Sequence, residues 1–319
     1  MNNMMIFDVP FSTALLFLRN GIEIYLLPYS VIAVLVIIVL SVTRIFGFLN
    51  PGNLPVYGVK KQSRNEKSPL KGKNFIFLGS SITKGFAAYG TSFVDNIAYR
   101  NDCICVKEAV SGTTLIDNSP KSYVNRLKGI DVGIKCDVFV CQLSTNDAAR
   151  NSPMGIMSEK KDMDSFNTKT VYGAVEYIIS YAKSIWDCPV VFYTSPQYAS
   201  PKYQEIVFAL EKVAAKWEIQ IIDLWSSKEL NEKRSISFRM NDQIHPTKKG
   251  YMAWTPVFES ALADVLAGRE IQIVKGLVPA LEQTRKRQIK KRILNYAKLA
   301  GIIIFTTVVV LGMCVFAVV

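Results

Sequence analysis

The stretch FIFLGSSITKG, residues 75–85, carries the clearest structural signal in this chain of 319 residues. Four apolar residues lead directly into Gly79, Ser80 and Ser81, and Thr83 follows closely. An unbroken apolar run is typical of a strand buried on both faces of a parallel sheet, and ligand crevices in open α/β sheets lie beyond the carboxyl ends of such strands. The more ordinary interpretation is that the hydroxyls cap a following helix, because serine and threonine side chains accept hydrogen bonds from its first N–H groups. The stretch alone leaves both interpretations open.

The segment around this stretch, residues 74–268, alternates short apolar runs with helical patterns. The expected strands cover residues 74–78, 104–110, 137–143, 189–194 and 220–224. The expected helices cover residues 92–100, 121–127, 170–186, 201–217 and 247–266. Such interleaving predicts one α/β domain, built on a parallel five-stranded sheet with helices on both faces. The connection 147–169 is long for a compact domain, and loops of that length are often lids or binding loops.

Two long uncharged runs contribute strongly to a hydrophobic content of 50% and a mean hydropathy of +0.19. Residues 24–43 and 299–319 contain no charged side chain. Each run is long enough to cross a hydrocarbon core of roughly 30 Å, and neither shows the polar positions that a buried core helix of that length would have. We therefore expect one transmembrane helix within residues 1–43 and a second at residues 299–319.

The net charge of +12 is concentrated beside these two runs. Residues 44–73 contribute +6 and residues 285–298 contribute +7, so the rest of the chain is close to neutral. A nucleic-acid-binding domain would carry its basic residues on the folded part, whereas basic clusters beside spans are typical of contact with anionic lipid headgroups. We predict membrane lipids as partners and no nucleic acid. Residues 44–73 are interpreted as a basic linker, and residues 269–298 as a basic juxtamembrane helix.

These charges also predict an orientation, because lysine and arginine near the ends of spans tend to stay in the cytoplasm. The basic excess follows the first expected span and precedes the second. Both asymmetries place the domain in the cytoplasm and both termini outside. The sequence predicts no oligomeric state.

The six cysteines form no CxxC motif and have no zinc-like spacing with the single histidine. Most lie in apolar, strand-like runs, where cysteine behaves as a small hydrophobic residue. The sequence therefore predicts neither a metal centre nor a disulfide framework.

The single histidine, His245, lies in the stretch NDQIHPTKKGY. A lone histidine often has no special role, but Asp242 lies three positions earlier in the same expected loop. Its carboxylate can accept a hydrogen bond from one ring nitrogen and leave the other free to take a proton from a hydroxyl. A serine nucleophile needs such a base, because its own pKa is far above neutral.

Two other loops follow expected strands and should lie at the same edge of the sheet as Ser81. Gly112 in EAVSGTTL can bring its backbone N–H close to a ligand, because it has no Cβ. Asn146 in QLSTNDA has a side-chain amide that can donate to an oxyanion. Each residue on its own could belong to an ordinary turn. Together with His245 they give the chain order Ser, Gly, Asn, His.

In this order and in the surrounding motifs, residues 74–266 resemble the SGNH hydrolases, the superfamily of GDSL-type esterases and lipases. GSSIT resembles the block that carries the nucleophile, and VSGTT resembles the glycine block. STND resembles the asparagine block, and DQIH matches the Asp-x-x-His block.

The resemblance implies a flavodoxin-like three-layer α/β/α sandwich. It implies a catalytic triad of Ser81, Asp242 and His245. It also implies an oxyanion hole formed by Ser81, Gly112 and Asn146, and it implies no metal or organic cofactor.

Two positions depart from the pattern of the family. Ser80 stands where aspartate usually precedes the nucleophile, and Ser144 stands where the asparagine block usually has glycine. The first departure leaves the catalytic groups untouched. The second is expected to narrow the space beside the oxyanion hole, which affects the choice of substrate more than the chemistry.

The function implied is that of a membrane-anchored serine esterase, which hydrolyses an acyl or acetyl ester through an acyl-enzyme, with a lipid as a fitting substrate. The alternative is an O-acetyl esterase or O-acyltransferase acting on a glycan or lipid-linked sugar, since the same acyl-enzyme would form. A non-catalytic membrane scaffold is disfavoured, because all four blocks keep their chemically competent residue.

Overall fold

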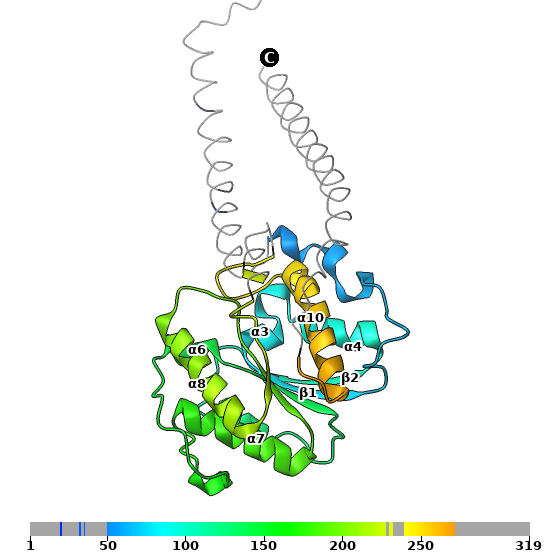
Figure 1. Ribbon diagram of the computed structural model, residues 1–319. Coiled ribbons are helices and arrows are strands. Elements are labelled where there is room, and N and C mark those ends of the chain that lie inside the picture. Colours follow the sequence, from blue (N-terminus) through cyan, green and yellow to red (C-terminus); the bar gives the residue numbers. More distant parts are fainter. Residues whose placement is uncertain are drawn as a thin grey trace, which may run out of the picture. The chain divides into compact units, whose positions relative to one another are not determined.

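Figure 1 shows the computed structural model of the chain. The structure describes residues 50–227, 230–231 and 239–271, together with Asn20, Ile32 and Leu35. Apart from Ile32 and Leu35, the two predicted spans lie outside the described residues, as does most of the predicted juxtamembrane helix. Within the part of the chain that is described, no helix combines the length and the apolar character needed to cross a membrane.

Five parallel strands form one sheet, in the order β2-β1-β3-β4-β5. Their bounds are β1 Asn74–Gly79, β2 Ile104–Ala109, β3 Val138–Gln142, β4 Val190–Tyr193 and β5 Gln220–Ile222. The predicted parallel five-stranded sheet is therefore confirmed, and its strand order is the flavodoxin-like one. The order of winding reverses between β1 and β3, and in such sheets the ligand crevice lies beyond the carboxyl ends of the strands at this point.

Alternating side chains of β1 build two separate hydrophobic cores. Phe75 and Phe77 face one helix layer, whereas Ile76 and Leu78 face the other. The first layer contains α4 (Phe93–Asn101) and α10 (Lys248–Leu266), and the second contains α5 (Tyr123–Leu127), α7 (Val171–Trp186) and α8 (Pro201–Trp217). Figure 1 shows the sheet between these two layers. Burial on both faces explains why β1 is a continuous apolar run and has no polar alternation.

Polar side chains at the helix starts explain why the longer helices could be located from the sequence. Ser92, Thr170, Ser200 and Thr247 each accept a hydrogen bond from a backbone N–H in the first turn of the helix that follows. Ser92 also forms a capping box with Asp95, whose carboxylate accepts from the Ser92 N–H. The helices α4, α7, α8 and α10 begin directly after these four residues, close to the predicted positions.

Residues 50–73, most of the predicted linker, form part of the folded domain. They contain three short 3-10 helices, η2 Pro51–Asn53, η3 Pro55–Tyr57 and η4 Val59–Lys61. Leu70 is 1% exposed and packs in the core formed with α4 and α10. The side-chain amide of Asn53 donates to Ala87 O at 2.6 Å, and its oxygen accepts from Lys248 N at 2.9 Å. The segment therefore differs from the expected linker: its prolines and glycines shape tight turns that pack on the domain.

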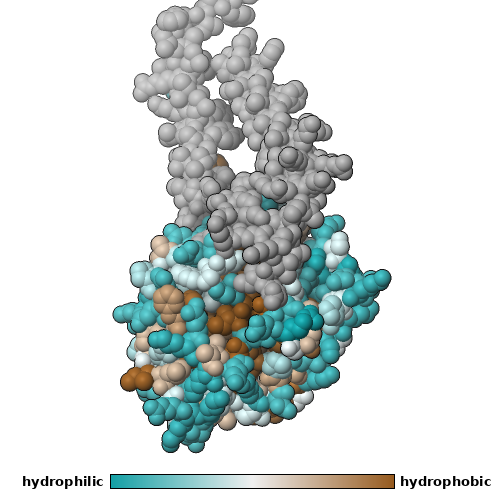
Figure 2. Space-filling view, viewed as in Figure 1, coloured by the Kyte–Doolittle hydropathy of each residue, from teal (hydrophilic) through white to brown (hydrophobic). Residues whose placement is uncertain are grey.

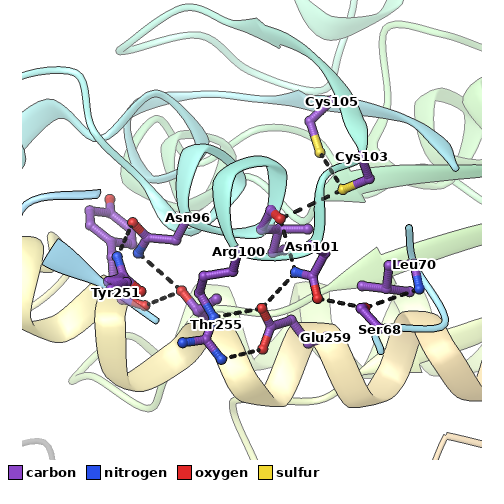
Figure 3. Close-up of polar contacts among 12 residues, drawn as sticks. Ser68, Leu70, Asn96, Arg100, Asn101, Cys103, Cys105, Tyr251, Thr255 and Glu259 are labelled. Carbon is purple, nitrogen blue, oxygen red and sulfur yellow. Dashed lines mark hydrogen bonds and ion pairs between the residues drawn. The ribbon is translucent and has the colours of Figure 1, made fainter. Parts of the chain in front are cut away.

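A network of polar side chains fastens this segment to α4 and α10, as Figure 3 shows. Ser68 Oγ donates to Asn101 Oδ1 at 2.6 Å, and Asn101 Nδ2 donates to Glu259 Oε1 at 2.7 Å. Glu259 on α10 also accepts two hydrogen bonds from Arg100, at 2.7 and 3.0 Å. Ser68 and Asn101 are buried, so their polar atoms depend on each other for hydrogen bonds.

The long connection after β3 is held against the second helix layer. It begins with α6 (Thr145–Ala149) and contains η6 (Met163–Ser165). Lys216 on α8 donates to the carbonyl oxygens of Ser158 (2.5 Å) and Lys160 (2.6 Å), and it forms an ion pair with the buried Glu176 on α7. These contacts tie residues 158–160 to the helix layer. That the connection 147–169 is a lid or a binding loop stays a prediction.

Replacement of Ser68 by alanine should lower the free energy of unfolding by about 1–3 kcal/mol, because the buried Asn101 Oδ1 loses its donor. The measurement is urea unfolding of the full chain in detergent, followed by tryptophan fluorescence. Ser63→Ala is the matched control, since Ser63 is exposed in the same segment. Equal stability of the two variants would contradict the packing of residues 50–73 on α4.

Candidate active site

Ser81 lies at the point where β1 turns into a helix. The strand ends at Gly79, and the four-residue helix α3 (Ser81–Lys84) begins two residues later. The turn requires glycine at position 79, because an added Cβ would overlap the hydroxyl oxygen of Thr83. Ser81 occupies the first position of α3, where a backbone N–H has no partner within the helix. The turn therefore presents both the hydroxyl and the N–H of Ser81 beyond the end of the strand.

The side chain of Gln142, at the end of the neighbouring strand β3, fixes this turn. Its carbonyl oxygen accepts hydrogen bonds from Ser80 N (2.9 Å), Thr83 Oγ1 (2.8 Å) and Thr83 N (3.3 Å). Gln142 is fully buried, so water does not compete for these bonds. On the side of α10, the Tyr251 hydroxyl donates to Ile82 O at 2.7 Å. The Ser81 turn is thus held both by the sheet and by α10.

His245 joins Ser81 and Asp242 in one hydrogen-bonded row. Its Nε2 lies 2.9 Å from Ser81 Oγ, and its Nδ1 lies 2.8 Å from Asp242 Oδ2. The other carboxylate oxygen, Asp242 Oδ1, accepts from the backbone N–H groups of Ile244 and His245, both at 2.7 Å. This local turn orients the carboxylate toward the ring. The structure therefore brings together the three residues that the sequence predicts as a triad.

The charge on Asp242 determines which nitrogen of His245 carries the proton. Burial by itself raises the pKa of the Asp242 carboxyl, but hydrogen bonds and charge attraction from His245, with two backbone N–H groups, outweigh it and bring the pKa below its ordinary value of 3.8. The carboxyl is therefore ionised at neutral pH and can only accept hydrogen bonds. Nδ1 must then be the protonated nitrogen, which leaves Nε2 able to accept the hydroxyl proton of Ser81.

Gly112 follows β2 in a loop that is tied to the end of β1. Arg126 Nη2 on α5 donates to Gly79 O at 2.7 Å and to Thr113 Oγ1 at 3.2 Å. Gly112 has a φ of +77°, a left-handed conformation that favours glycine over residues with a Cβ. Its carbonyl oxygen accepts from Arg150 Nη2 at 2.8 Å, whereas its N–H has no acceptor among the described residues. That N–H is available to a ligand at this edge of the sheet.

Asn146 belongs to the short helix α6, which follows β3. Its side-chain amide donates one hydrogen bond to Thr113 O at 3.0 Å, which leaves a second amide hydrogen for another acceptor. Ser144 caps α6 by accepting from Asn146 N at 3.1 Å, and its hydroxyl donates to Thr113 O at 3.3 Å. Ser144 is fully buried. Its hydroxyl therefore supports the position of Asn146. The expected narrowing beside the oxyanion hole stays a prediction.

Asp147, next to Asn146, fastens the loop that follows Gly112. It is fully buried, and its Oδ2 accepts from Leu115 N at 2.7 Å. Burial raises the pKa of its carboxyl, while the hydrogen bond from Leu115 N opposes that rise. The carboxyl group thus ties together the two loops that carry Gly112 and Asn146.

The predicted site residues gather at one edge of the sheet. Ser81, Gly112 and Asn146 follow β1, β2 and β3, which are adjacent strands. Asp242 and His245 reach the same edge from the loop before α10. Their catalytic roles stay predictions. Among the residues described, no group of three or more His, Cys, Asp or Glu side chains is placed to hold a metal ion.

Sequence analysis missed two residues that hold this site, Gln142 and Arg126. A signal existed for Gln142, because a polar side chain within a strand buried on both faces needs hydrogen-bond partners inside the protein. Arg126 binds Gly79 O and pairs with Glu108 Oε1 at 2.8 Å. Nothing in its local pattern distinguishes it from an ordinary surface arginine on a helix, although its side chain is only 9% exposed.

Comparisons with known proteins give structural matches only. No protein-family model matches the chain, and no curated protein matches it. Three of the similar solved structures are a protein from Lactobacillus plantarum, a member of the lipolytic protein G-D-S-L family from Veillonella parvula, and a variant of an acetyl xylan esterase from Geobacillus stearothermophilus.

Each of these three structures is 18% identical to the chain, with TM-scores of 0.49, 0.44 and 0.44 in the same order. The matches cover 58%, 59% and 65% of this chain, and 94%, 97% and 98% of the other chains. Similarity at this level carries no argument about activity, so the function has to be argued from the residues of the site.

Ser81→Ala should abolish labelling by a fluorophosphonate, whereas Ser80→Ala should keep most of it. Ser81 Oγ lies 2.9 Å from His245 Nε2, while the buried Ser80 side chain lies against Gln142 Oε1 at 3.4 Å. Mass spectrometry of the labelled peptide identifies the modified residue. An adduct on Ser80, or full labelling of the Ser81→Ala variant, would show that the wrong serine has been assigned.

Proposed function

We propose that this chain is a serine ester hydrolase of the SGNH superfamily, with Ser81 as the nucleophile. The observation that carries the proposal is the row in which His245 lies 2.9 Å from Ser81 Oγ and 2.8 Å from Asp242 Oδ2. The four sequence blocks support it, because they occur in the order that the superfamily has and each keeps its reactive residue.

The reaction begins with attack of Ser81 Oγ on the carbonyl carbon of the ester. His245 Nε2 takes the hydroxyl proton during the attack, and Asp242 stabilises the imidazolium that forms. The carbonyl oxygen becomes an oxyanion in a tetrahedral intermediate. The imidazolium then protonates the alkoxy oxygen, the C–O bond to the alcohol breaks, and the acyl group stays on Ser81.

Water completes the cycle by the same route. His245 takes a proton from the water as its oxygen attacks the acyl-enzyme, and a second tetrahedral intermediate forms. The proton then passes to Ser81 Oγ as the carboxylic acid leaves. An acyltransferase would differ only in this half of the reaction, where a sugar hydroxyl would replace water.

Three donors are available for the oxyanion. They are the Ser81 N–H, the Gly112 N–H and the amide hydrogen of Asn146 that is not bonded to Thr113 O. Donors fixed before the reaction stabilise the charge as it develops, and they need no reorganisation at that moment.

In this proposal the chain is anchored in the membrane, its domain is cytoplasmic and its ester belongs to a lipid. The support is the pair of uncharged runs at residues 24–43 and 299–319, with their basic flanks. A panel of esters of increasing acyl length, offered to the full chain, tests this substrate class. If the chain hydrolyses none of these esters, the proposed hydrolase activity is refuted. A preference for acetylated sugars would favour the alternative, an esterase or acyltransferase that acts on a glycan.

Asn146→Ala should lower kcat for ester hydrolysis by roughly 10² to 10³, with a smaller effect on KM, because the amide acts on charge that develops in the transition state. The measurement is steady-state hydrolysis of a soluble ester by the full chain. Asn65→Ala is the control, since Asn65 is an exposed residue outside the site. A change confined to KM would instead make Asn146 a residue that binds the ground state of the substrate.

A cysteine in place of Ser63 should resist a membrane-impermeant maleimide in intact cells and react after permeabilisation, because the basic flanks predict a cytoplasmic domain. Ser63 is exposed. The substitution is made in a cysteine-free background shown to stay active, because Cys105 and Cys136 are only partly buried and would react as well. The same background without the new cysteine is the control. Rapid labelling of the variant in intact cells would reverse the orientation and direct the search for a substrate to the outer side.

A further inference from the structure

Four large apolar side chains are exposed on two segments that are joined by a hydrogen bond, and one of the four lies against His245. Leu54 and Val56 are 37% and 43% exposed, and Phe86 and Tyr89 are 41% and 51% exposed. Figure 2 shows a domain surface on which hydrophilic residues predominate and hydrophobic ones gather in a few places. Apolar side chains that cluster on such a surface often mark a site of interaction.

These side chains, on two neighbouring segments, are together called the rim: Leu54, Val56, Phe86 and Tyr89. The amide of Asn53, which precedes Leu54, donates to Ala87 O at 2.6 Å, and Ala87 follows Phe86. The centre of the Phe86 ring lies 5.4 Å from the centre of the His245 ring. The rim therefore borders the candidate active site.

Several lysines belong to the segments that carry the rim or contact it. Lys60 and Lys61 end the 3-10 helix that follows Val56, Lys84 ends α3, and all three are exposed. Lys248 Nζ lies 4.9 Å from the centre of the Tyr89 ring. Their positive charges suit an anionic surface.

Acidic residues are rare in the same segments. Residues 50–61 and 84–90 contain no aspartate or glutamate, and residues 239–249 contain only Asp242, whose charge is engaged with His245. Exposed apolar and aromatic groups accompanied by lysines match the interface of an anionic bilayer, because the interface accepts apolar groups and its phosphates attract lysines.

Only a short stretch of chain joins the first predicted span to the segment that carries Leu54 and Val56. Asn50 Nδ2 donates to Met240 O at 3.3 Å and to Asn241 Oδ1 at 3.5 Å, in the loop that leads to His245. The predicted span ends at residue 43, and seven residues of fully extended chain reach at most about 25 Å. Asn50 therefore lies within that distance of the end of the predicted span, whatever path the intervening residues take.

From the rim, its lysines and this short connection, we propose that the rim docks on the surface of an anionic phospholipid bilayer, with the active site opening toward it. The apolar and aromatic side chains enter the interfacial region, and the lysines bind phosphate groups. One consequence rests on the proposed function: the ester attacked by Ser81 belongs to a lipid of the same bilayer.

Hydrogen exchange of the full chain in lipid nanodiscs tests the docking without any substrate. Discs of phosphatidylglycerol are compared with discs of phosphatidylcholine. Amides of residues 54–61 and 84–90 should exchange at least about threefold more slowly in the anionic discs, because docking suppresses local opening. Residues 128–136, which precede β3 at the opposite edge of the sheet, should exchange equally in both. Equal exchange of the rim segments in the two kinds of disc would overturn the proposal.

Charge reversal provides a matched pair of variants for the same measurement. Lys60→Glu/Lys61→Glu should remove the difference between the two kinds of disc. Lys135→Glu/Lys212→Glu makes the same change in net charge at exposed positions away from the rim, and it should keep the difference. Loss of the difference in both variants would attribute it to overall charge and would also overturn the proposal.

Turnover separates a failure of docking from a failure of the hydrolase. The Lys60→Glu/Lys61→Glu variant should hydrolyse a soluble short-chain ester at the parental rate and a phospholipid in the anionic disc at least about fivefold more slowly. If this variant hydrolyses the phospholipid at the parental rate, or loses activity equally on the phospholipid and the soluble ester, the substrate is not delivered from the bilayer through the rim. A parent chain that cleaves no ester would refute the proposed function, and the exchange measurement would still decide the docking.

Discussion

The carbonyl oxygen of the Gln142 side chain determines the geometry around Ser81. It ties the end of β3 to the turn after β1 through hydrogen bonds from Ser80 N and from the hydroxyl and N–H of Thr83. Thr83 reaches this oxygen only because Gly79 leaves free the space that a Cβ would take. Loss of the acceptor would leave buried donors without a partner, at a cost of about 1–3 kcal/mol for each group. The direction in which the chain leaves β1, and with it the position of the Ser81 hydroxyl, therefore depends on a residue of another strand.

The same strand end also positions the candidate oxyanion donor, because α6 with Asn146 begins three residues after Gln142. A small displacement of the end of β3 would move the Ser81 turn and Asn146 together. The distance between them would therefore change less than the position of either one. The site has a cost in stability, since Gln142 Nε2 and Ser111 Oγ are buried and have no hydrogen-bond partner among the described residues. Locally unfavourable groups of this kind are expected beside functional residues, where geometry is kept at the expense of stability.

The sequence predicts those parts of the structure whose cause is local. Strands buried on both faces appear as apolar runs, and capping residues such as Ser92 and Thr247 mark the helix starts. The site residues could be predicted because their chemistry resides in their type and order. The role of residues 50–73 could not, since the contacts of Asn53 and Ser68 join residues 34 and 33 positions apart, and a composition rich in proline, glycine and lysine suits a linker equally well. The helices α3 and α6 are too short to show a period, and the length of a loop does not reveal that Lys216 holds it.

Asn53 connects the two halves of the candidate site. Ser81 and His245 lie 164 positions apart, and proton transfer between them requires that their separation stay within hydrogen-bond reach. The amide of Asn53 binds Ala87 O, shortly after α3, and its oxygen binds Lys248 N, at the start of α10. Since Asn53 is 6% exposed, both bonds are shielded from water and bridge the elements that follow each of the two residues. A segment that looks like a spacer therefore helps to hold the distance on which catalysis would depend. Composition suggests a domain boundary at residue 74. Cutting the chain there would remove Asn53, which helps to hold the site, as well as the first predicted membrane span.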